Sequence, residues 1–409
     1  MDDASTIPHP PLPAHVPPHL VRLWNFDAAP GAHADPYAAN RPLHDGPEIF
    51  FSPLMATYRD PGAWVLTRTD HMREMFQDTE TFSSRHIAGF SLLLGEDWPL
   101  LPLEKDPPDH GKYRMLLNPL FAPAKIAALE AGIRETAADL VGRALPNGGC
   151  DFEKAFGRPF PVTIFLRLMG LPLEHADRFV QWETGLLHGK SVDESRAAAL
   201  AIKTYLMDVI AERRRAPIDD LVSVAVTSRI DGQLLSDEEI LGVCYLLFVA
   251  GLDTIAATLG FTFKHLATHP QDQQLLRDEP DLIPNAVEEL IRSHAVVTSP
   301  RYVTRDVDFH GAPMKAGDRV LLPMQLSGRD PREHEGPDRI DFRRQDIRHI
   351  SFAAGPHRCV GSHLARREIR IALEEWLKRV PEFRIAPGEA AVTHATSVWG
   401  VDYLPLSWA

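Results

Sequence analysis

The stretch from Ser236 to about His269 most constrains the fold of this chain, because it predicts one very long helix. Ser236-Asp-Glu-Glu239 is a capping box, in which the serine and the glutamate satisfy the first backbone N–H groups of a helix. Nothing obvious stops the helix before His269-Pro270. The helix should therefore contain about 34 residues and measure roughly 50 Å, enough to cross the whole molecule.

The middle of this helix carries residues that an apolar helix normally lacks. Phe248-Val-Ala-Gly251-Leu-Asp253-Thr254 places a glycine, an acid and an alcohol in an apolar segment, where each is unfavourable. Gly251 would let the helix open or let another group lie close against it. Thr254 can turn its hydroxyl back on the helix or outward to a ligand. The simpler alternative is a helix kink with a satisfied buried acid.

Other segments predict a mainly α fold with a minor β part. Apolar residues recur at helical spacing in most of the chain, and strands are expected at residues 63–68, 301–323 and 390–406. Residues 1–45, rich in proline, are expected to form an N-terminal arm rather than a packed element, with a single domain over 46–409. The apolar stretch 87–103 has no clean period, so it should be buried or form the wall of an apolar pocket.

Composition narrows the class of protein. The three cysteines cannot form a disulfide framework, which favours an intracellular, cytoplasmic protein. No signal peptide is visible, and no membrane-spanning helix is expected. The formal net charge of -13 argues against nucleic-acid binding. Arginine is nevertheless concentrated between residues 329 and 370, which is either a solvated face or a docking patch for an acidic partner.

A glycine-punctuated loop, Phe352-Ala-Ala-Gly355-Pro-His357-Arg-Cys359-Val-Gly361, delivers a cysteine to the start of a helix predicted over 362–380. Unpaired N–H groups and the helix dipole there favour thiolate over thiol. On its own the cysteine could be a core thiol, a nucleophile, a zinc ligand or a haem ligand. His357 and His349 make no recognisable zinc set. Haem ligation uses more of the sequence, because it also needs cations for two propionates and groups that deliver protons.

Three motifs together resemble the cytochrome P-450 superfamily. Phe352-x-x-Gly355-x-His357-x-Cys359-x-Gly361 is similar to its haem-binding loop, and Ala250-Gly251-x-Asp253-Thr254 to its oxygen-binding helix. Glu289-x-x-Arg292 is similar to its buried Glu-Arg pair. Ala353 departs from the glycine that is usual in the family. Over most of the chain the resemblance is to the bacterial camphor hydroxylase and its close relatives.

The resemblance implies the cytochrome P-450 fold, haem b as cofactor, and a role for each matching residue. Cys359 would be the metal ligand, and Asp253 and Thr254 the catalytic acid and alcohol. Arg339 would be the third member of the Glu289–Arg292 pair. The other haem-binding positions would be His110, Arg114, Arg301, Phe352, Gly355, His357 and Gly361. The substrate-binding positions would be Trp98, Leu246, Val249, Ala250, Val297, Ser299 and Val398.

Two departures bear on the substrate and on the acid. Trp98 stands where the camphor enzyme has a tyrosine whose hydroxyl holds the substrate ketone; an indole N–H can still donate, but it sits differently. His188 stands where that enzyme pairs an arginine with the catalytic acid, so the gating of Asp253 should differ.

The predicted function is a monomeric monooxygenase that uses dioxygen to hydroxylate a small apolar molecule. A terpenoid or norisoprenoid ketone such as an ionone is expected, rather than camphor. The resemblance implies electrons from a [2Fe–2S] ferredoxin and its flavoprotein reductase. A haem gas sensor without turnover and a cysteine hydrolase are the alternatives.

Overall fold

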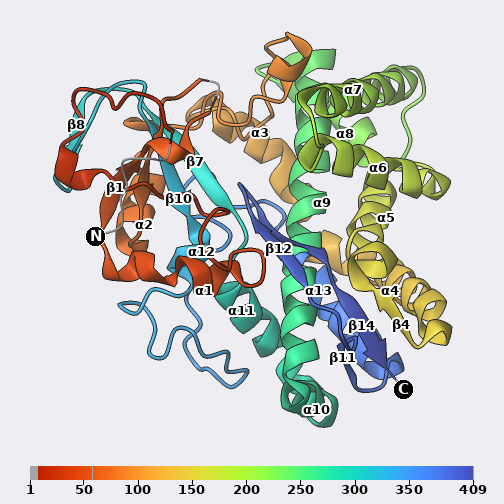
Figure 1. Cartoon of the computed structure of the whole chain (residues 1–409). Helices are drawn as coiled ribbons and strands as arrows, with labels where there is room; N and C mark the ends of the chain where they lie inside the picture. Colours follow the sequence, from red (N-terminus) through yellow and green to blue (C-terminus); the bar gives the residue numbers. More distant parts are fainter. Residues whose placement is uncertain (1–7, 58, 409) are drawn as a thin grey trace. The chain divides into compact units, whose positions relative to one another are not determined.

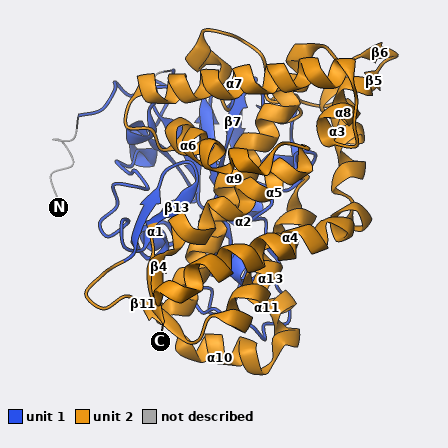
Figure 2. Cartoon of the chain, turned by 90° about the vertical axis from the view of Figure 1, so that its right-hand side faces the viewer, with its two compact units in different colours: residues 1–87, 288–358, 391–402 blue, residues 88–287, 359–390, 403–409 orange. Residues whose placement is uncertain are grey.

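The structure is a computed structural model that describes residues 8–57 and 59–408. Contacts divide the chain into two compact units (Figure 2). Unit 1 contains residues 1–87, 288–358 and 391–402, and unit 2 contains residues 88–287, 359–390 and 403–409. The expected boundary near residue 45 does not coincide with a boundary between these units.

Unit 1 is built on a five-stranded sheet of order β1-β2-β10-β7-β3. β2 and β10 run parallel, with Val320 opposite Trp64, and the other neighbours are antiparallel. The strands of unit 1 are β1 (Ile49–Ser52), β2 (Ala63–Leu66), β3 (Phe82–Ser83), β7 (Thr298–Val303), β8 (Val307–Phe309), β9 (Ala312–Met314), β10 (Arg319–Pro323), β12 (Val392–Ala395) and most of β13 (Trp399–Tyr403). Its helices are η1 (Pro18–Leu20), α1 (Pro36–Asn40), η2 (Arg41–Asp45), η3 (Pro53–Met55), α2 (Thr69–Gln77), α12 (Met324–Ser327) and the end of α11 (Ile283–Ser293).

The sequence-based expectation of an unpacked N-terminal arm is wrong for residues 8–45. Tyr37 is 4% exposed and Leu43 is fully buried. The Tyr37 hydroxyl donates to the carbonyl of Ala295 at 2.9 Å, and the Asp35 side chain caps α1. Proline is common here because it starts short helices at their first turn, not because the segment avoids packing.

Unit 2 is mainly helical, with α9 in contact with most of the other helices (Figure 1). Its long helices are α3 (Asp109–Leu117), α4 (Pro123–Ala144), α5 (Pro159–Leu168), α6 (Ala176–Leu187), α7 (Val192–Arg215), α8 (Leu221–Thr227), α9 (Asp237–Thr268), α10 (Pro270–Asp278) and α13 (Ser362–Arg379). Short helical turns are η4 (Ser91–Leu94), η5 (Asn118–Phe121), η6 (Leu145–Asn147), the π-helix η7 (Glu153–Gly157), η8 (Leu173–His175) and η9 (Pro280–Leu282). Its strands are β4 (Gly149–Asp151), β5 (Arg229–Ile230), β6 (Gln233–Leu234), β11 (Phe383–Ile385) and β14 (Pro405–Trp408).

The predicted long helix is confirmed as α9. Its capping box is formed, with Ser236 and Glu239 bonding each other's backbone N–H groups. The helix continues through Gly251 without interruption. By length and composition α9 could cross a membrane, but 72% of its most apolar window is buried inside the structure.

Aromatic packing fixes α13 against α9 in unit 2. Phe263 of α9 lies 5.1 Å from Trp376 of α13, and 4.4 Å from Phe152 beside the π-helix, between ring centroids. Arg134 of α4 also reaches Glu374 and Glu375 of α13, at 2.7 and 2.6 Å. The start of α13, and with it the position of Cys359, is therefore held relative to α9.

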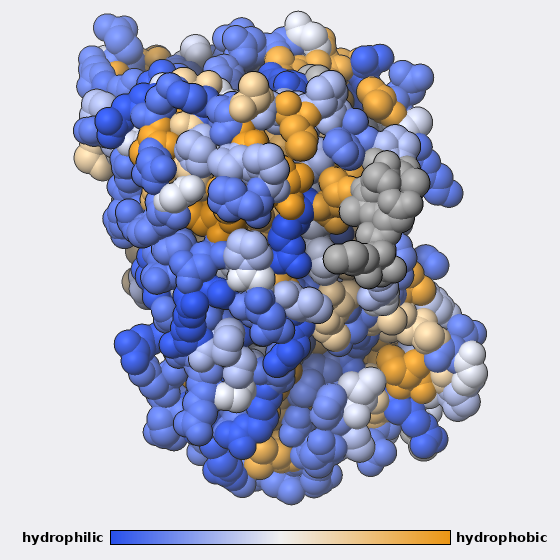
Figure 3. Space-filling model, turned by 60° about the vertical axis from the view of Figure 1, so that its left-hand side comes forward, coloured by the Kyte–Doolittle hydropathy of each residue, from blue (hydrophilic) through white to orange (hydrophobic). Residues whose placement is uncertain are grey.

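The surface agrees with the acidic, polar composition. The face drawn in Figure 3 is covered mainly by hydrophilic residues, between which hydrophobic residues form small separate groups. Apolar surface of this scattered kind is normal for a folded protein and marks no interaction site by itself.

Candidate active site

The middle of α9 is open although the rest of the helix core is buried. Between Ile240 and Phe263 every residue is buried except Val249, Ala250, Gly251 and Thr254. A Cβ atom added at Gly251 would meet nothing within 4 Å. The space beside this turn is therefore not filled by protein side chains. We call Val249, Ala250, Gly251 and Thr254 the open stretch of α9.

An acid and an alcohol adjoin at the open stretch. The Thr254 hydroxyl donates to the Ala250 carbonyl at 2.8 Å, so in this structure it turns back on the helix. Asp253 is 8% exposed and points to another partner, His188. The helix is unbroken through this stretch, and the buried acid is satisfied by His188 as the simpler alternative expects. The arrangement leaves Thr254 able to turn outward and Asp253 close behind it.

His188, directly after α6, holds the carboxylate of Asp253. Its Nε2 lies 3.0 Å from Asp253 Oδ1 and 3.8 Å from Glu183 Oε1. Burial opposes protonation of His188, but the hydrogen bond to Asp253 and the two carboxylate charges outweigh it and raise its pKa. Burial and the Asp253 charge likewise raise the pKa of Glu183. The acid is thus paired with a titratable group, as the His188 departure predicted.

Glu183 is a member of this cluster that the sequence did not indicate. Its Oε2 accepts hydrogen bonds from Arg158 at 3.4 Å and from the Thr184 hydroxyl at 3.2 Å. Its position in the middle of α6 carries no local signal, because an acid in an amphipathic helix usually faces solvent. The ligand atoms of Glu183, His188 and Asp253 lie close enough to share a cation, but the neighbouring Arg158 guanidinium opposes one.

Cys359 is exposed and lies three residues before Ser362, the first residue of α13. Gly361 is the N-cap residue of that helix, and a Cβ atom there would lie 3.9 Å from the Cys359 sulfur. The sulfur therefore lies beside the start of α13, where the first N–H groups have no partner within the helix. An exposed thiol at a helix start is unusual for a core cysteine, which is normally buried.

The loop before Cys359 needs glycine-like backbone conformations in unit 1. Gly355 has φ +69°, and a Cβ atom there would meet the Phe76 carbonyl oxygen at 2.3 Å. Ala353 also has a positive φ, +59°. The left-handed conformation costs a residue with a Cβ roughly 1–2 kcal/mol. This explains why glycine is usual at that position in the resembling family, and shows that alanine is tolerated.

The predicted haem-binding residues are distributed over both units. In unit 1, Arg301 is 1% exposed; its Nη1 donates to Ser299 Oγ at 3.0 Å, and the guanidinium lies 5.1 Å from the centre of the Phe76 ring. In unit 2, α3 carries the buried His110 and the half-buried Arg114, whose Nε donates to Asn118 at 3.0 Å. The structure thus brings Arg301 together with Ser299, a predicted substrate contact.

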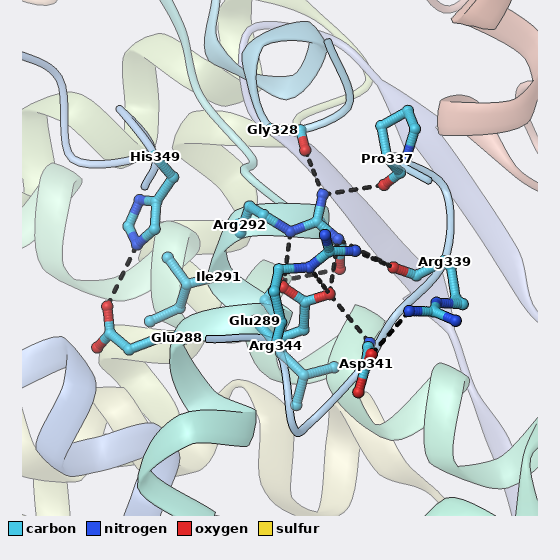
Figure 4. A network of polar contacts seen from close by, with 12 residues as sticks. Glu288, Glu289, Ile291, Arg292, Gly328, Pro337, Arg339, Asp341, Arg344 and His349 are labelled. Atoms are coloured by element: carbon cyan, nitrogen blue, oxygen red, sulfur yellow. Dashed lines mark hydrogen bonds and ion pairs between the residues drawn. The ribbon is translucent and has the colours of Figure 1, made fainter. Parts of the chain in front are cut away.

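Glu289 and Arg292 form a buried ion pair in unit 1 (Figure 4). Both side chains are fully buried, and two bonds of 2.7 and 2.8 Å join them. The prediction that Arg339 is the third member is wrong for its side chain, which is 73% exposed and pairs with Asp341. Arg344 takes that place, with Nε 3.0 Å from Glu289 Oε1. Arg339 contributes only its carbonyl, which accepts from Arg292.

The Trp98 indole is not available as the polar contact to a substrate. Its Nε1 donates to Glu96 Oε2 at 2.6 Å, and Glu96 also pairs with Lys203 of α7. The tryptophan is 6% exposed and packs against Tyr245 of α9, with ring centroids 5.0 Å apart. Sequence reasoning overlooked Tyr245, although a lone phenol in the apolar run before Leu246 was a usable signal.

The other predicted pocket residues fall into two groups. Leu246, Val249 and Ala250 lie on α9, and Leu246 is buried at the N-terminal side of the open stretch. Val297, Ser299 and Val398 are half-buried in unit 1, where Val297 and Val398 form an antiparallel bridge.

These features fit a flat, thiolate-ligated group within unit 2. An unfilled space lies along one turn of the buried helix α9, and Gly251 in that turn faces it. The exposed Cys359 thiol precedes α13, which packs on the same α9. When bound there, a haem would supply the chemistry of dioxygen cleavage that a thiolate ligand favours. The residues present therefore fit the cofactor that the sequence motifs implied.

Comparison with known proteins identifies the family. The cytochrome P450 family matches residues 186–390. A probable cytochrome P450 127A1 of Sinorhizobium fredii is 44% identical over 98% of this chain and 97% of its own length. The crystal structures of cytochrome P450 CYP101C1 (36% identity, 97% of this chain, 100% of that chain) and CYP101J2 (30%, 98%, 100%) superpose with TM-scores of 0.88 and 0.87. These matches overturn the cysteine-hydrolase and sensor alternatives. The chain belongs to the cytochrome P450 family and is a haem b-binding monooxygenase with the cytochrome P450 fold.

Proposed function

We propose that this cytochrome P450 is a soluble cytoplasmic enzyme, monomeric in solution, that hydroxylates a small apolar terpenoid or norisoprenoid ketone. It takes its electrons from a [2Fe–2S] ferredoxin that is reduced by a flavoprotein. The observation that carries the proposal is the open stretch of α9, where space for substrate and cofactor adjoins an acid and an alcohol. The similarity to CYP101C1 and CYP101J2 supports it.

In this proposal each site residue has one task. Cys359 ligates the iron, and Arg114, Arg301, His110 and His357 hold the propionates. Thr254 and Asp253 deliver protons at the Thr254 Oγ1 atom, with His188 and Glu183 behind the acid. Trp98 closes the pocket by packing, because its N–H is already used. Apolar walls with few polar groups orient a substrate while leaving the accepted range broad.

Two measurements test the proposal on the haem-loaded protein. The reduced protein with carbon monoxide should show the strongly red-shifted absorbance band of thiolate ligation. Titration with ionones, camphor and linear fatty acids should then give the largest spin-state shift, at the lowest concentration, with the ionones. A panel in which fatty acids bind more tightly than both terpenoids would reject the substrate class while leaving the monooxygenase assignment intact.

Thr254→Ala should separate electron consumption from product formation. The variant lacks the hydroxyl that positions a proton donor at the open stretch. NADH use should therefore persist, while the amount of hydroxylated product per NADH falls several-fold and peroxide formation rises. Thr258→Ala is the matched control. Thr258 lies on the same helix and makes the same kind of bond, to the Thr254 carbonyl at 2.7 Å, but it is buried. Equal coupling in the two variants would contradict the proton-delivery role.

The cations of α3 and α13 should govern reaction with the ferredoxin. Many of its arginines are already paired: Arg367 and Arg370 of α13 contact Glu130. Lys112 of α3 pairs with the exposed acids Asp109 and Asp231, at 3.1 and 2.7 Å. Such exposed pairs exchange partners readily, since each is worth roughly 0–1 kcal/mol. We therefore expect an acidic ferredoxin to compete for these cations.

Lys112→Gln should raise the KM for ferredoxin by about two- to fivefold at low salt, and the difference should vanish as salt screens the charges. Arg143→Gln is the control, because Arg143 is an exposed cation of α4 that pairs with Asp139 in the same way. The proposed docking surface is refuted by a KM that is insensitive to both Lys112 and salt.

A further inference from the structure

The hydroxyl of Tyr245 is buried without a hydrogen-bond partner among the described residues. Tyr245 lies on α9 and is fully buried. Burial alone raises the pKa of its phenol. Nearly all buried polar groups in folded proteins are hydrogen-bonded, so a phenol without a partner calls for an explanation. One explanation is a ligand that supplies the missing partner.

The surroundings of Tyr245 are aromatic and belong to the stretch 88–104. The Tyr245 ring lies 5.0 Å from Trp98 and 6.2 Å from Phe90, between centroids, and 6.3 Å from Phe248 of α9. Phe90 is only half-buried, so its ring can give way to an incoming molecule. An apolar molecule with a single oxygen would match this environment.

The stretch 88–104 is held against α9 by contacts that do not involve the Tyr245 hydroxyl. The Leu101 N–H donates to the Gly242 carbonyl at 3.2 Å, and a Cβ atom at Gly242 would lie 2.3 Å from the Pro99 carbonyl oxygen. The buried Glu104 carboxylate accepts from the N–H groups of Ala88 and Leu100, at 2.9 and 2.8 Å. Trp98 bonds Glu96, and none of these contacts uses the Tyr245 hydroxyl.

Tyr245 stands next to the open stretch of α9. Val249 follows it by four residues and therefore lies on the same face, one turn along. Thr254 follows by nine residues, or two and a half turns, so its side chain lies on the opposite face of the helix. A molecule that touches the phenol therefore adjoins the open stretch at Val249.

We propose that the Tyr245 hydroxyl, and not the Trp98 indole, is the specificity-determining contact to the substrate, and that it hydrogen-bonds one ketone or alcohol oxygen. The proposal rests on the proposed function, because it assumes that the reacting carbon lies at the open stretch.

The test compares Tyr245→Phe with the unmodified holoenzyme, using β-ionone and its parent hydrocarbon without the carbonyl. Loss of one neutral hydrogen bond should weaken β-ionone binding about three- to tenfold in a spectral titration, while hydrocarbon binding stays unchanged. The unmodified protein should also bind β-ionone more tightly than camphor. An equal effect of the substitution on ketone and hydrocarbon overturns the proposal, as does the absence of binding by either ligand.

Thermal unfolding without ligand separates recognition from a structural role. Tyr245→Phe should leave Tm unchanged or raise it, because the phenol has no partner to lose. Tyr205→Phe is the matched control: its hydroxyl bonds His175 Nδ1 at 2.9 Å, so Tm should fall by about 1–2 °C. A fall in Tm for Tyr245→Phe like that of the control overturns the proposal. Failure of the proposed function would appear separately, as a missing thiolate band in the unmodified protein.

Discussion

Arg292→Met lowers the free energy of unfolding by about 3–5 kcal/mol, the expected cost of removing one partner from a buried ion pair. Glu289 and Arg292 are both fully buried. Arg292 also donates to the carbonyls of Gly328, Pro337 and Arg339. The substitution therefore removes two bonds to a fully buried carboxylate, which keeps only Arg344 and the Asp341 N–H as partners, and it takes a donor from three carbonyls. Urea unfolding followed by circular dichroism measures the loss.

Two further variants show whether the loss comes from the Glu289 carboxylate that has lost Arg292. The double variant Glu289→Leu/Arg292→Met removes both charges and should be more stable than Arg292→Met alone, although Arg344 then loses its partner as well. Arg339→Met should cost less than about 1 kcal/mol, because that side chain is mostly exposed and pairs only with Asp341. A larger loss for Arg339→Met than for Arg344→Met would contradict the network as drawn in Figure 4.

The helices and strands that depend mainly on residues close together in the sequence were predictable. The capping box of α9, the strand at residues 63–66 and the helix at residues 69–77 follow from caps and periodicity within a few residues. The opening in α9 was also indicated, since Gly251, Asp253 and Thr254 contradict the rules of a buried helix. A local conflict of this kind is where function is expected.

The side chains with which each polar group pairs were not predictable, because the pairing depends on residues far apart in the sequence. The sequence alone does not distinguish Arg339 from Arg344. Only the path of the chain from residue 328 to 344 decides which guanidinium reaches Glu289. The Trp98 N–H bonds Glu96, which is only two residues away but is itself paired with the distant Lys203 of α7. Proline content misled the prediction for residues 8–45, since proline starts turns in packed segments as readily as it marks arms.

Cys359→Ser should abolish the red-shifted carbon monoxide band and all turnover, while the polypeptide should keep its secondary structure. Cys359 is exposed, so its side chain contributes little to packing. The other two cysteines cannot replace it as thiolates: burial raises the pKa of Cys150 and of Cys244 to about 12. Since only a thiolate ligates iron in this way, the spectral signature must depend on Cys359 alone.

Cys244→Ser is the matched control, because it makes the same atomic change at a buried position of α9. A polar hydroxyl among apolar side chains should lower the unfolding free energy by about 1–3 kcal/mol and leave the band intact. The two variants should therefore have opposite effects. Cys359→Ser should change the spectrum and not the stability of the haem-free chain, and Cys244→Ser should lower the stability and leave the spectrum unchanged. A red-shifted band that survives in Cys359→Ser would refute the ligand assignment, since no other cysteine of this chain is poised to ionise.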